Sequence, residues 1–287
     1  SCHLYAAYYS SPFVNINKKI LGITADGSGD NISSTISLIK NNKFNLISKT
    51  SRHSSLAKIY SRITMLLGMK PWEHEYKVMG LAPYSSSKLV DKEIYKLEKL
   101  LKVNKKKLIF EKKTTLSMNY IMDYLIENFK FKRFDIVAGV VQKFTENMIT
   151  ELIKESIKKT KTDILVCGGG LFMNIKANKL ISEIPELKKV FFMPSSGDES
   201  LSIGASLYGY YKNNKKPIKS TIKNLYFGRD YTKEENKEKI VKISDKYKIK
   251  YKIINNNKDY KKIAKLLANN KIVARCCERS EWGARAL

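Results

Sequence analysis

The chain has 287 residues, and its hydrophobic fraction of 43% is typical of a folded globular protein and excludes a disordered chain. Its formal net charge is +27, but the positive residues are mostly scattered lysines, whereas specific nucleic-acid recognition favours arginine forks. We therefore expect no specific nucleic-acid partner, although the charge can attract anionic nucleotides. The sequence has no run of about 18 apolar residues and no charged-then-apolar leader, so it predicts no membrane segment and no secretion signal.

The cysteines show no CxxC spacing, so they predict neither a zinc site nor a disulfide framework. They are Cys2, Cys167, Cys276 and Cys277. A reducing cytoplasm is the expected location.

The pattern of apolar residues predicts alternating strands and helices. Three β-branched segments predict a β-meander over Lys19–Asp26, Asn31–Leu38 and Phe44–Ser48. Helical spacing predicts helices over Ser54–Met69, Leu89–Leu101, Met118–Phe129, Asp135–Lys158 and Glu199–Tyr211. Short buried strands are expected at Asp163–Cys167 and Val190–Met193. The small residues of the Glu199–Tyr211 helix indicate that another backbone packs closely against it.

A lysine-rich segment, Asn213–Lys223, predicts a linker and a domain boundary near residue 225. Beyond it, the pattern predicts two helices and two strands in alternation. The helices are Lys233–Lys246 and Asp259–Asn269, and the strands are Lys248–Ile254 and Ile272–Cys276. The sequence therefore predicts an α/β fold in two domains, over residues 1–224 and 225–287.

The run Glu73–Tyr84 is the most unusual segment, because charged residues lead directly into an apolar stretch punctuated by glycine and proline, EHEYKVMGLAPY. This mixture predicts a loop held against a pocket. Lys77 could neutralise a phosphate, and Glu75 could orient Lys77 or an acceptor hydroxyl. The alternative is a structural salt bridge between the two. His53 and His74 are each open as a base, an anion ligand or a satisfied polar group.

Five further segments carry similar short motifs in a fixed order along the chain. They are His3–Phe13, Thr24–Gly27, Gly169–Asn174, Pro194–Asp198 and Glu278–Leu287. Together with the Glu73–Tyr84 run, they resemble the NodU/TobZ-type O-carbamoyltransferase family. The chain departs from the family pattern at Leu171, Ser85 and Ala284, where the family usually has Val, Gly and Pro.

The resemblance implies a specific fold for each domain. Residues 1–224 would form an actin/hexokinase/heat-shock-chaperone-like (RNase H-like) Kae-type domain that lacks its N-terminal part. Residues 225–287 would begin an α/β YrdC-like domain that is truncated. Because the chain starts at Ser1 and stops inside a motif at Leu287, we expect an internal fragment of a longer protein that is inactive by itself.

His3, Asp26 and Asp198 are candidate metal ligands, because an imidazole and two carboxylates suit iron, manganese or zinc. From the residues alone, simpler roles are favoured: an idle terminal histidine, a turn aspartate and a helix N-cap. The resemblance implies the metal role. It also implies that His3 is the second member of a histidine pair, whose first member would precede Ser1.

Gly168, Gly169 and Gly170 follow a predicted strand, where their amides could approach a phosphate or ribose, although a tight strand–helix turn also uses glycines. Asn174 offers an amide nearby, and Gly197 ends the next strand, so two strand-end loops could face one cleft. The resemblance implies that this cleft holds the nucleotide part of a carbamoyl adenylate.

Arg279 and Arg285 flank Glu281–Gly283 near the end of the chain. Guanidinium groups suit phosphate or carbamoyl phosphate, and surface ion pairs are the alternative. The resemblance implies that this segment belongs to the domain that builds the adenylate.

The resemblance implies ATP-dependent O-carbamoyl transfer. Carbamoyl phosphate and ATP would give carbamoyl adenylate, and a hydroxyl of a small, sugar-containing acceptor would receive the carbamoyl group. The expected cofactors are ATP and a divalent metal, no membrane partner is expected, and a homodimer is left open. Three alternatives remain: a tRNA threonylcarbamoyl-transfer enzyme of the same fold, a non-catalytic basic nucleic-acid-binding protein, and a sugar kinase.

Overall fold

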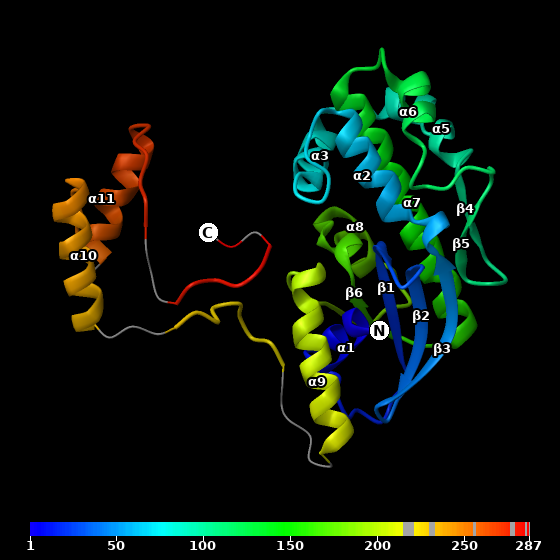
Figure 1. Cartoon of the computed structure of the whole chain (residues 1–287), viewed down its shortest axis with the longest axis horizontal. Helices are drawn as coiled ribbons and strands as arrows, with labels where there is room; N and C mark the ends of the chain where they lie inside the picture. The colour runs from blue at the N-terminus through cyan, green and yellow to red at the C-terminus, as the bar shows by residue number, and fades with distance from the viewer. Residues whose placement is uncertain (215–220, 230–232, 255–256, 276–278, 285, 287) are drawn as a thin grey trace. The chain divides into compact units, whose positions relative to one another are not determined.

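The computed structural model describes residues 1–214, 221–229, 233–254, 257–275, 279–284 and 286 (Figure 1). The chain divides into two compact units, Ser1–Lys223 and Asn224–Leu287. Each unit is described by itself. None of the described helices is long and apolar enough to cross a membrane.

The first unit contains both strands and helices. Its strands are β1 (Ile20–Gly29), β2 (Ile32–Lys40), β3 (Lys43–Ser51), β4 (Leu101–Asn104), β5 (Ile109–Lys112), β6 (Ile164–Gly168) and β7 (Lys189–Phe192). Its α-helices are α1 (Cys2–Tyr9), α2 (Leu56–Leu66), α3 (Glu75–Leu81), α4 (Ser87–Glu93), α5 (Tyr95–Glu98), α6 (Met122–Phe129), α7 (Phe134–Thr160), α8 (Ile175–Ser182) and α9 (Leu201–Asn213). Its short 3₁₀ helices are η1 (Arg52–Ser54), η2 (Ala82–Tyr84), η3 (Gly170–Met173) and η4 (Asp198–Ser200).

The main sheet of the described residues has five strands in the order β3-β2-β1-β6-β7. The first three strands form an antiparallel meander, and β6 and β7 continue the sheet parallel to β1. The predicted meander and both predicted short strands are therefore confirmed. The first unit is a mixed α/β structure, whereas its finer assignment to the Kae type stays a prediction.

Helices cover both faces of the sheet (Figure 1). Ile23 of β1 belongs to one buried cluster with Ile59 of α2 and Val141 of α7. The preceding residue, Gly22, faces the other way, because a side chain at this position would meet Leu4 of α1. The sheet is therefore sandwiched between α1 on one face and α2 with α7 on the other.

The longest helix, α7, forms the centre of the core, as its apolar stripe predicts. Its 27 residues span about 40 Å. The residues of the predicted stripe are all buried: Val137, Val140, Val141, Phe144, Met148, Leu152 and Ile153. The helix ends at Lys161, which adopts the left-handed conformation common at helix C-termini (φ 54°).

Helices α1 and α9 pack closely against each other (Figure 1). Gly204 of α9 lies against the backbone of α1, where a side chain would collide with the carbonyl of Cys2. The close approach predicted for this small-residue helix is thus confirmed. Two pairs of tyrosine rings stack between the helices with centroids 4.2 Å apart, Tyr5 with Tyr208 and Tyr9 with Tyr211.

Some predicted elements differ from the structure. The single helix expected over Leu89–Leu101 is two helices, α4 and α5, and Leu101 already belongs to β4. Two of the apolar residues that suggested one continuous helix, Leu97 and Leu101, are both buried, but Leu97 lies in α5 and Leu101 in β4. The β4–β5 hairpin and α8 were not predicted.

The Glu73–Tyr84 run is not the loop that its composition predicted. It forms α3 followed by η2, and both helices pack against α7. Val78 is fully buried and joins the core cluster. Pro83 is tolerated because it lies at the start of η2, where a missing N–H breaks no helical hydrogen bond. The apolar residues of the run therefore serve a helix–helix contact rather than a loop.

The second unit contains α10 (Lys233–Tyr247) and α11 (Asn257–Ala268), which agree with its two predicted helices. The two predicted strands are wrong within the described residues 248–254 and 272–275, which have no strand hydrogen bonding. Strands need a paired neighbour and a buried face, and Ile249, Tyr251 and Ile253 are about half exposed. The YrdC-like assignment of this unit stays a prediction.

Candidate metal centre

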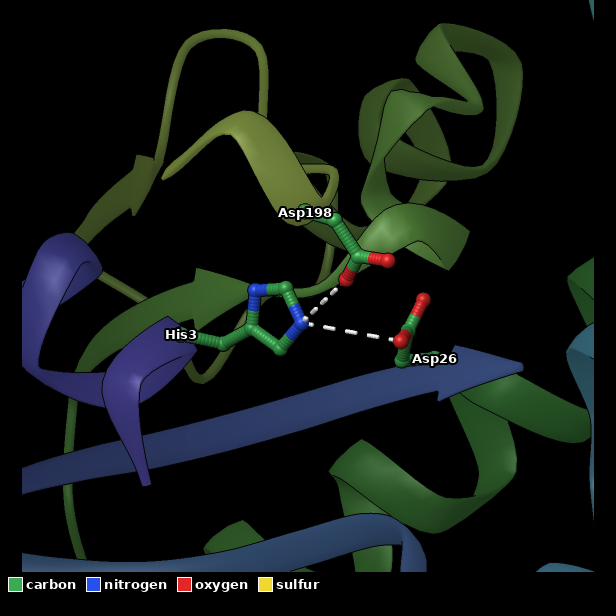
Figure 2. Close-up of side chains that lie close together, drawn as sticks. All are labelled: His3, Asp26 and Asp198. Atoms are coloured by element: carbon green, nitrogen blue, oxygen red, sulfur yellow. Dashed lines mark ion pairs between the residues drawn. The ribbon is translucent and has the colours of Figure 1, made fainter. Parts of the chain in front are cut away.

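Three side chains from distant parts of the sequence converge at one end of the sheet (Figure 2). His3 lies in the first turn of α1, Asp26 near the end of β1, and Asp198 at the start of η4 after β7. His3 Nε2 lies 3.5 Å from Asp26 Oδ2 and 3.5 Å from Asp198 Oδ1. One donor atom from each residue lies within 4.8 Å of the others. We call these residues the His3–Asp26–Asp198 trio.

Glycines at the end of β6 bring the segments of the trio together. A side chain at Gly168 would collide with the carbonyl of His3, so only glycine lets α1 approach this strand. Gly169 has φ +99°, which L-residues rarely adopt, and its N–H donates to the carbonyl of Ser196 (3.0 Å). The Gly170 N–H donates to Asp26 Oδ1 (3.1 Å). The amides of Gly169 and Gly170 are thus engaged within the fold, and a phosphate role for these glycines stays a prediction.

Hydrogen bonding sets the tautomer of His3. Ser200 Oγ donates its single proton to the carbonyl of Gly197 (2.8 Å), so it can only accept from His3 Nδ1–H, which lies 3.4 Å away. With the proton on Nδ1, a neutral imidazole presents the lone pair of Nε2 toward the carboxylates of Asp26 and Asp198. Three acceptors facing one another repel unless a proton or a metal ion lies among them.

Two opposing effects act on the Asp26 carboxyl. Burial alone would raise its pKa, because it disfavours the charged form. When His3 is protonated, its hydrogen bond and charge, together with the N–H groups of Gly27 and Gly170, outweigh burial and hold the pKa of Asp26 below its usual value. Asp26 is therefore ionised at neutral pH and is ready to bind a cation.

The geometry of the trio fits a divalent transition metal. Ligands that lie about 2.1 Å from a common metal are separated by roughly 3.0–3.4 Å, and the two Nε2–carboxylate distances of 3.5 Å are close to this range. Imidazole with carboxylates is a donor set that iron, manganese and zinc accept. The exposed side chain of Asp198 leaves one side of the trio open to a ligand.

Asn174 has a structural role in the fold. Its side-chain oxygen accepts from the N–H of Ala177 and caps α8, and its amide exchanges two 3.0 Å hydrogen bonds with Gln142. Tyr60 donates to the same Gln142 (2.8 Å). Burial, with the charges of Glu146 and Glu75, raises the pKa of Tyr60 well above its usual value, so Tyr60 remains a donor. Direct contact of Asn174 with a nucleotide stays a prediction.

The expected catalytic residues have their interaction partners outside the trio. Glu75 accepts a hydrogen bond from the N–H of Trp72 (2.7 Å), and Lys77 Nζ lies 5.9 Å from the ring centroid of Tyr76. In the described part of the chain no ion pair joins Glu75 to Lys77, so the structural salt bridge considered above does not form. His53 is exposed, and its Nδ1 lies 2.9 Å from Ser117 Oγ. No hydrogen bond or ion pair joins these residues to the trio among the described residues.

The remaining candidate site residues belong to different units of the chain. Gly197 precedes Asp198, and a side chain there would meet the Glu199 carboxylate. Arg279, in the second unit, donates from Nε to the carbonyl of Gly228 (2.6 Å). Arg285 lies outside the described residues. A role for the two arginines in binding carbamoyl phosphate stays a prediction.

Ser200 and Gln142 were not predicted as site residues from the sequence. Ser200 lies only two residues after Asp198, and a hydroxyl so close to a candidate ligand is a signal for a residue that orients the site. Gln142 carried no local signal, because it lies inside the apolar pattern of α7. Only the fold brings it to Asn174.

The family model described as carbamoyltransferase N-terminus matches residues 1–207, which include the whole trio. The chain belongs to this family. The resemblance stated from its motifs is thus confirmed.

This member of the carbamoyltransferase family is similar in sequence to three curated proteins that carry different names. It is 29% identical to the uncharacterized protein MJ1051 of Methanocaldococcus jannaschii, over 94% of this chain and 52% of that protein. It is 22% identical to the nodulation protein NolO of Bradyrhizobium diazoefficiens, over 99% of this chain and 50% of NolO. It is 26% identical to the tRNA N6-adenosine threonylcarbamoyltransferase of Ureaplasma parvum, over 75% of this chain and 64% of that protein. The chain spans about half the length of the first curated relatives it matches.

Proposed function

We propose that this chain supplies the carbamoyl-transfer site of an ATP-dependent O-carbamoyltransferase with the Kae-type fold. The observation that carries the proposal is the convergence of His3, Asp26 and Asp198 at the end of the sheet, within the part that the family model matches. In this proposal, carbamoyl phosphate, water and ATP give carbamoyl adenylate, phosphate and pyrophosphate in a YrdC-like domain. The carbamoyl group then passes to a small hydroxylated acceptor at the trio.

The transfer step breaks one bond and forms one bond. The acceptor oxygen bonds to the carbamoyl carbon, the bond from that carbon to the adenylate phosphate oxygen breaks, and AMP leaves with the electron pair. A divalent cation bound at the trio would polarise the carbamoyl oxygen or anchor the phosphate as a Lewis acid. Asp26 and Asp198 would hold this cation, and Ser200 would keep Nε2 of His3 free to join them.

The polar residues outside the trio would assist the transfer. The exposed ammonium of Lys77 would neutralise the phosphate, and the Glu75 carboxylate would accept the hydroxyl proton. His53 is a second candidate for the proton acceptor, because it is exposed and has a hydroxyl partner in Ser117. Gly168, Gly169, Gly170 and Asn174 would shape the nucleotide side of the site.

A second candidate function is threonylcarbamoyl transfer to tRNA. The 26% identity to the Ureaplasma parvum enzyme and the net charge of +27 favour it. The two functions differ in salt dependence, because an enzyme that contacts many tRNA phosphates loses affinity steeply as salt rises. Tight tRNA binding that weakens by roughly tenfold or more between about 50 and 200 mM salt would favour this candidate.

The decisive experiment uses the complete protein as its gene encodes it. The protein is incubated with ATP, carbamoyl phosphate and Fe²⁺, Mn²⁺ or Zn²⁺, and mass spectrometry detects carbamoyl adenylate and pyrophosphate. The variant Asp198→Ala should still form the adenylate but should lose transfer to an acceptor. Absence of adenylate with every metal would refute the proposed function.

A further inference from the structure

Three basic residues lie near one another on η1 and α2, and one of them, Lys58, lies next to Asp26 of the trio. Lys58 and Arg62 are one helical turn apart on α2, and Arg52 lies in η1 just before this helix. Lys58 Cε lies 3.4 Å from where a side-chain carbon on Gly27 would be, next to Asp26. We call these three residues the Arg52–Lys58–Arg62 cluster.

The positive charges of the cluster are not neutralised within the protein. In the part of the chain that the structure describes, no ion pair joins any of the three residues to a carboxylate. Arg52 Nε is shielded from solvent and has no hydrogen-bond partner among the described residues, although Nη1 of the same side chain donates to Asn31 (3.3 Å). A buried donor without a partner is unfavourable, so this nitrogen indicates an absent acceptor.

Electrostatics within the cluster leads to the same conclusion. Burial, followed by the positive charges of Arg62 and Arg52, lowers the pKa of Lys58, while the charge of Asp26 opposes them. Like charges one turn apart on a helix repel each other. An anion bound among the three side chains would remove this repulsion.

Trp72 adds an aromatic surface to the cluster. Lys58 Nζ lies 4.9 Å from the centroid of its ring, and the side chain is nevertheless 69% exposed. The backbone of Trp72 has φ +68°, an unfavourable conformation for a bulky residue, and its N–H is held by Glu75. Strain of this kind is concentrated at ligand sites. An exposed ring held over a lysine can stack on a sugar.

We propose that the Arg52–Lys58–Arg62 cluster and Trp72 bind the phosphate and the sugar ring of a phosphorylated sugar that acts as the carbamoyl acceptor. The proposal rests on the proposed function and adds the chemical class of the acceptor. A phosphomonoester carries about −1.5 to −2 at neutral pH, which would offset most of the three positive charges of the cluster.

The first test measures phosphate binding by the complete protein with saturating Mn²⁺ and AMP, using calorimetry. Inorganic phosphate should bind while AMP is present. The double variant Lys58→Met with Arg62→Met should weaken phosphate binding by roughly tenfold for each charge removed. Lys99→Met is the matched control, because Lys99 lies over Tyr95 at 5.0 Å but outside the cluster. This control should leave phosphate affinity unchanged, and unfolding curves should show that all variants fold.

The outcomes of this test show whether the cluster belongs to the acceptor site or to the nucleotide site. Competition between phosphate and AMP would assign the cluster to the nucleotide site and overturn the acceptor proposal. Equal phosphate binding by wild type and double variant, or none by wild type, would also overturn it. Because none of these readouts requires adenylate formation, the proposal can fail while the proposed function holds.

The second test addresses the sugar. Glucose 6-phosphate should bind more tightly than inorganic phosphate, and Trp72→Ala should abolish this difference while keeping phosphate affinity. Equal affinities for the two ligands in the wild type would overturn the stacking role of Trp72.

Discussion

The His3–Asp26–Asp198 trio and the Glu73–Tyr84 run place their polar groups in opposite ways. The trio draws single residues from α1, β1 and η4, which are up to 195 positions apart in the chain, and brings their donor atoms within 4.8 Å. The run concentrates charged residues in one short segment. Its Glu75 and Lys77 make no ion pair with each other in the described structure.

The two regions also depend on the fold in different ways. The trio exists only because glycines at the end of β6 let α1 approach, so its geometry depends on backbone packing. The run is a local helix anchored on α7 by Val78, whereas Glu73 and Lys77 are exposed. We therefore expect the trio to be sensitive to small backbone changes and the run to tolerate changes at its polar positions without unfolding.

The largest expected effect is on metal binding at the trio. Asp26→Asn keeps the size of the side chain and an oxygen for the Gly170 N–H, but removes a charged ligand. Even residues that only orient ligands change metal affinity by 10- to 100-fold, so loss of this ligand should weaken Mn²⁺ binding by about 100-fold or more. Calorimetric titration with Mn²⁺ measures this effect.

The matched variant in the run is Glu75→Gln. It should leave Mn²⁺ affinity within about twofold, because Glu75 makes no hydrogen bond or ion pair with the trio among the described residues. Equal losses in Asp26→Asn and Glu75→Gln would show that the two regions form one metal site.

Two glycines give the next comparison. Gly168→Ala should destabilise the protein by about 1–3 kcal/mol, because its methyl group would collide with the carbonyl of His3. Gly80→Ala, in α3, has no atom within 4 Å of the new methyl group and should stabilise the helix by roughly 0.5–1 kcal/mol. Urea unfolding of both variants measures the difference, and effects of the same sign would contradict it.

The sequence predicted the elements whose side chains follow one clear period. Helix α7 and the β1–β3 meander carry long, regular apolar patterns, because each buries a continuous stripe or face. The prediction of a loop over the Glu73–Tyr84 run was wrong, because it relied on glycine and proline. Gly80 lies on an open helix surface, and Pro83 lies in a first helical turn.

The members of the trio were named from motifs, but their arrangement could not be predicted from spacing. The contact of Gly168 with His3 and the hydrogen bond of Ser200 to His3 join residues far apart in the chain. No local pattern encodes such pairs. The strand expected over Lys248–Ile254 failed for a related reason, since alternating residues make a strand only when another strand pairs with them.

Within the Glu73–Tyr84 run, a substitution at a buried position should lower the free energy of unfolding much more than one at an exposed polar position. Val78→Ala should lower the free energy of unfolding by roughly 2 kcal/mol, because Val78 is fully buried against α7. Lys77→Met should change it by less than about 0.5 kcal/mol, because the ammonium is exposed. If Lys77 neutralises a phosphate as proposed, the same variant should nevertheless lose carbamoyl transfer. Unchanged transfer in Lys77→Met would leave the run with a purely structural role.

The smallest effect expected at the trio comes from the residue that orients His3. Ser200→Ala removes the acceptor of His3 Nδ1–H, so the imidazole can rotate or take the other tautomer, and Mn²⁺ affinity should fall by about tenfold. Ser202→Ala is the matched control, because this exposed hydroxyl bonds only to the carbonyl of Glu199 (3.3 Å) in the described structure. Ser202→Ala should bind Mn²⁺ as the wild type does. Equal Mn²⁺ affinities for the wild type, Ser200→Ala and Ser202→Ala would show that the packing of α1 on α9 alone orients His3. Ser200 would then not set the tautomer of His3.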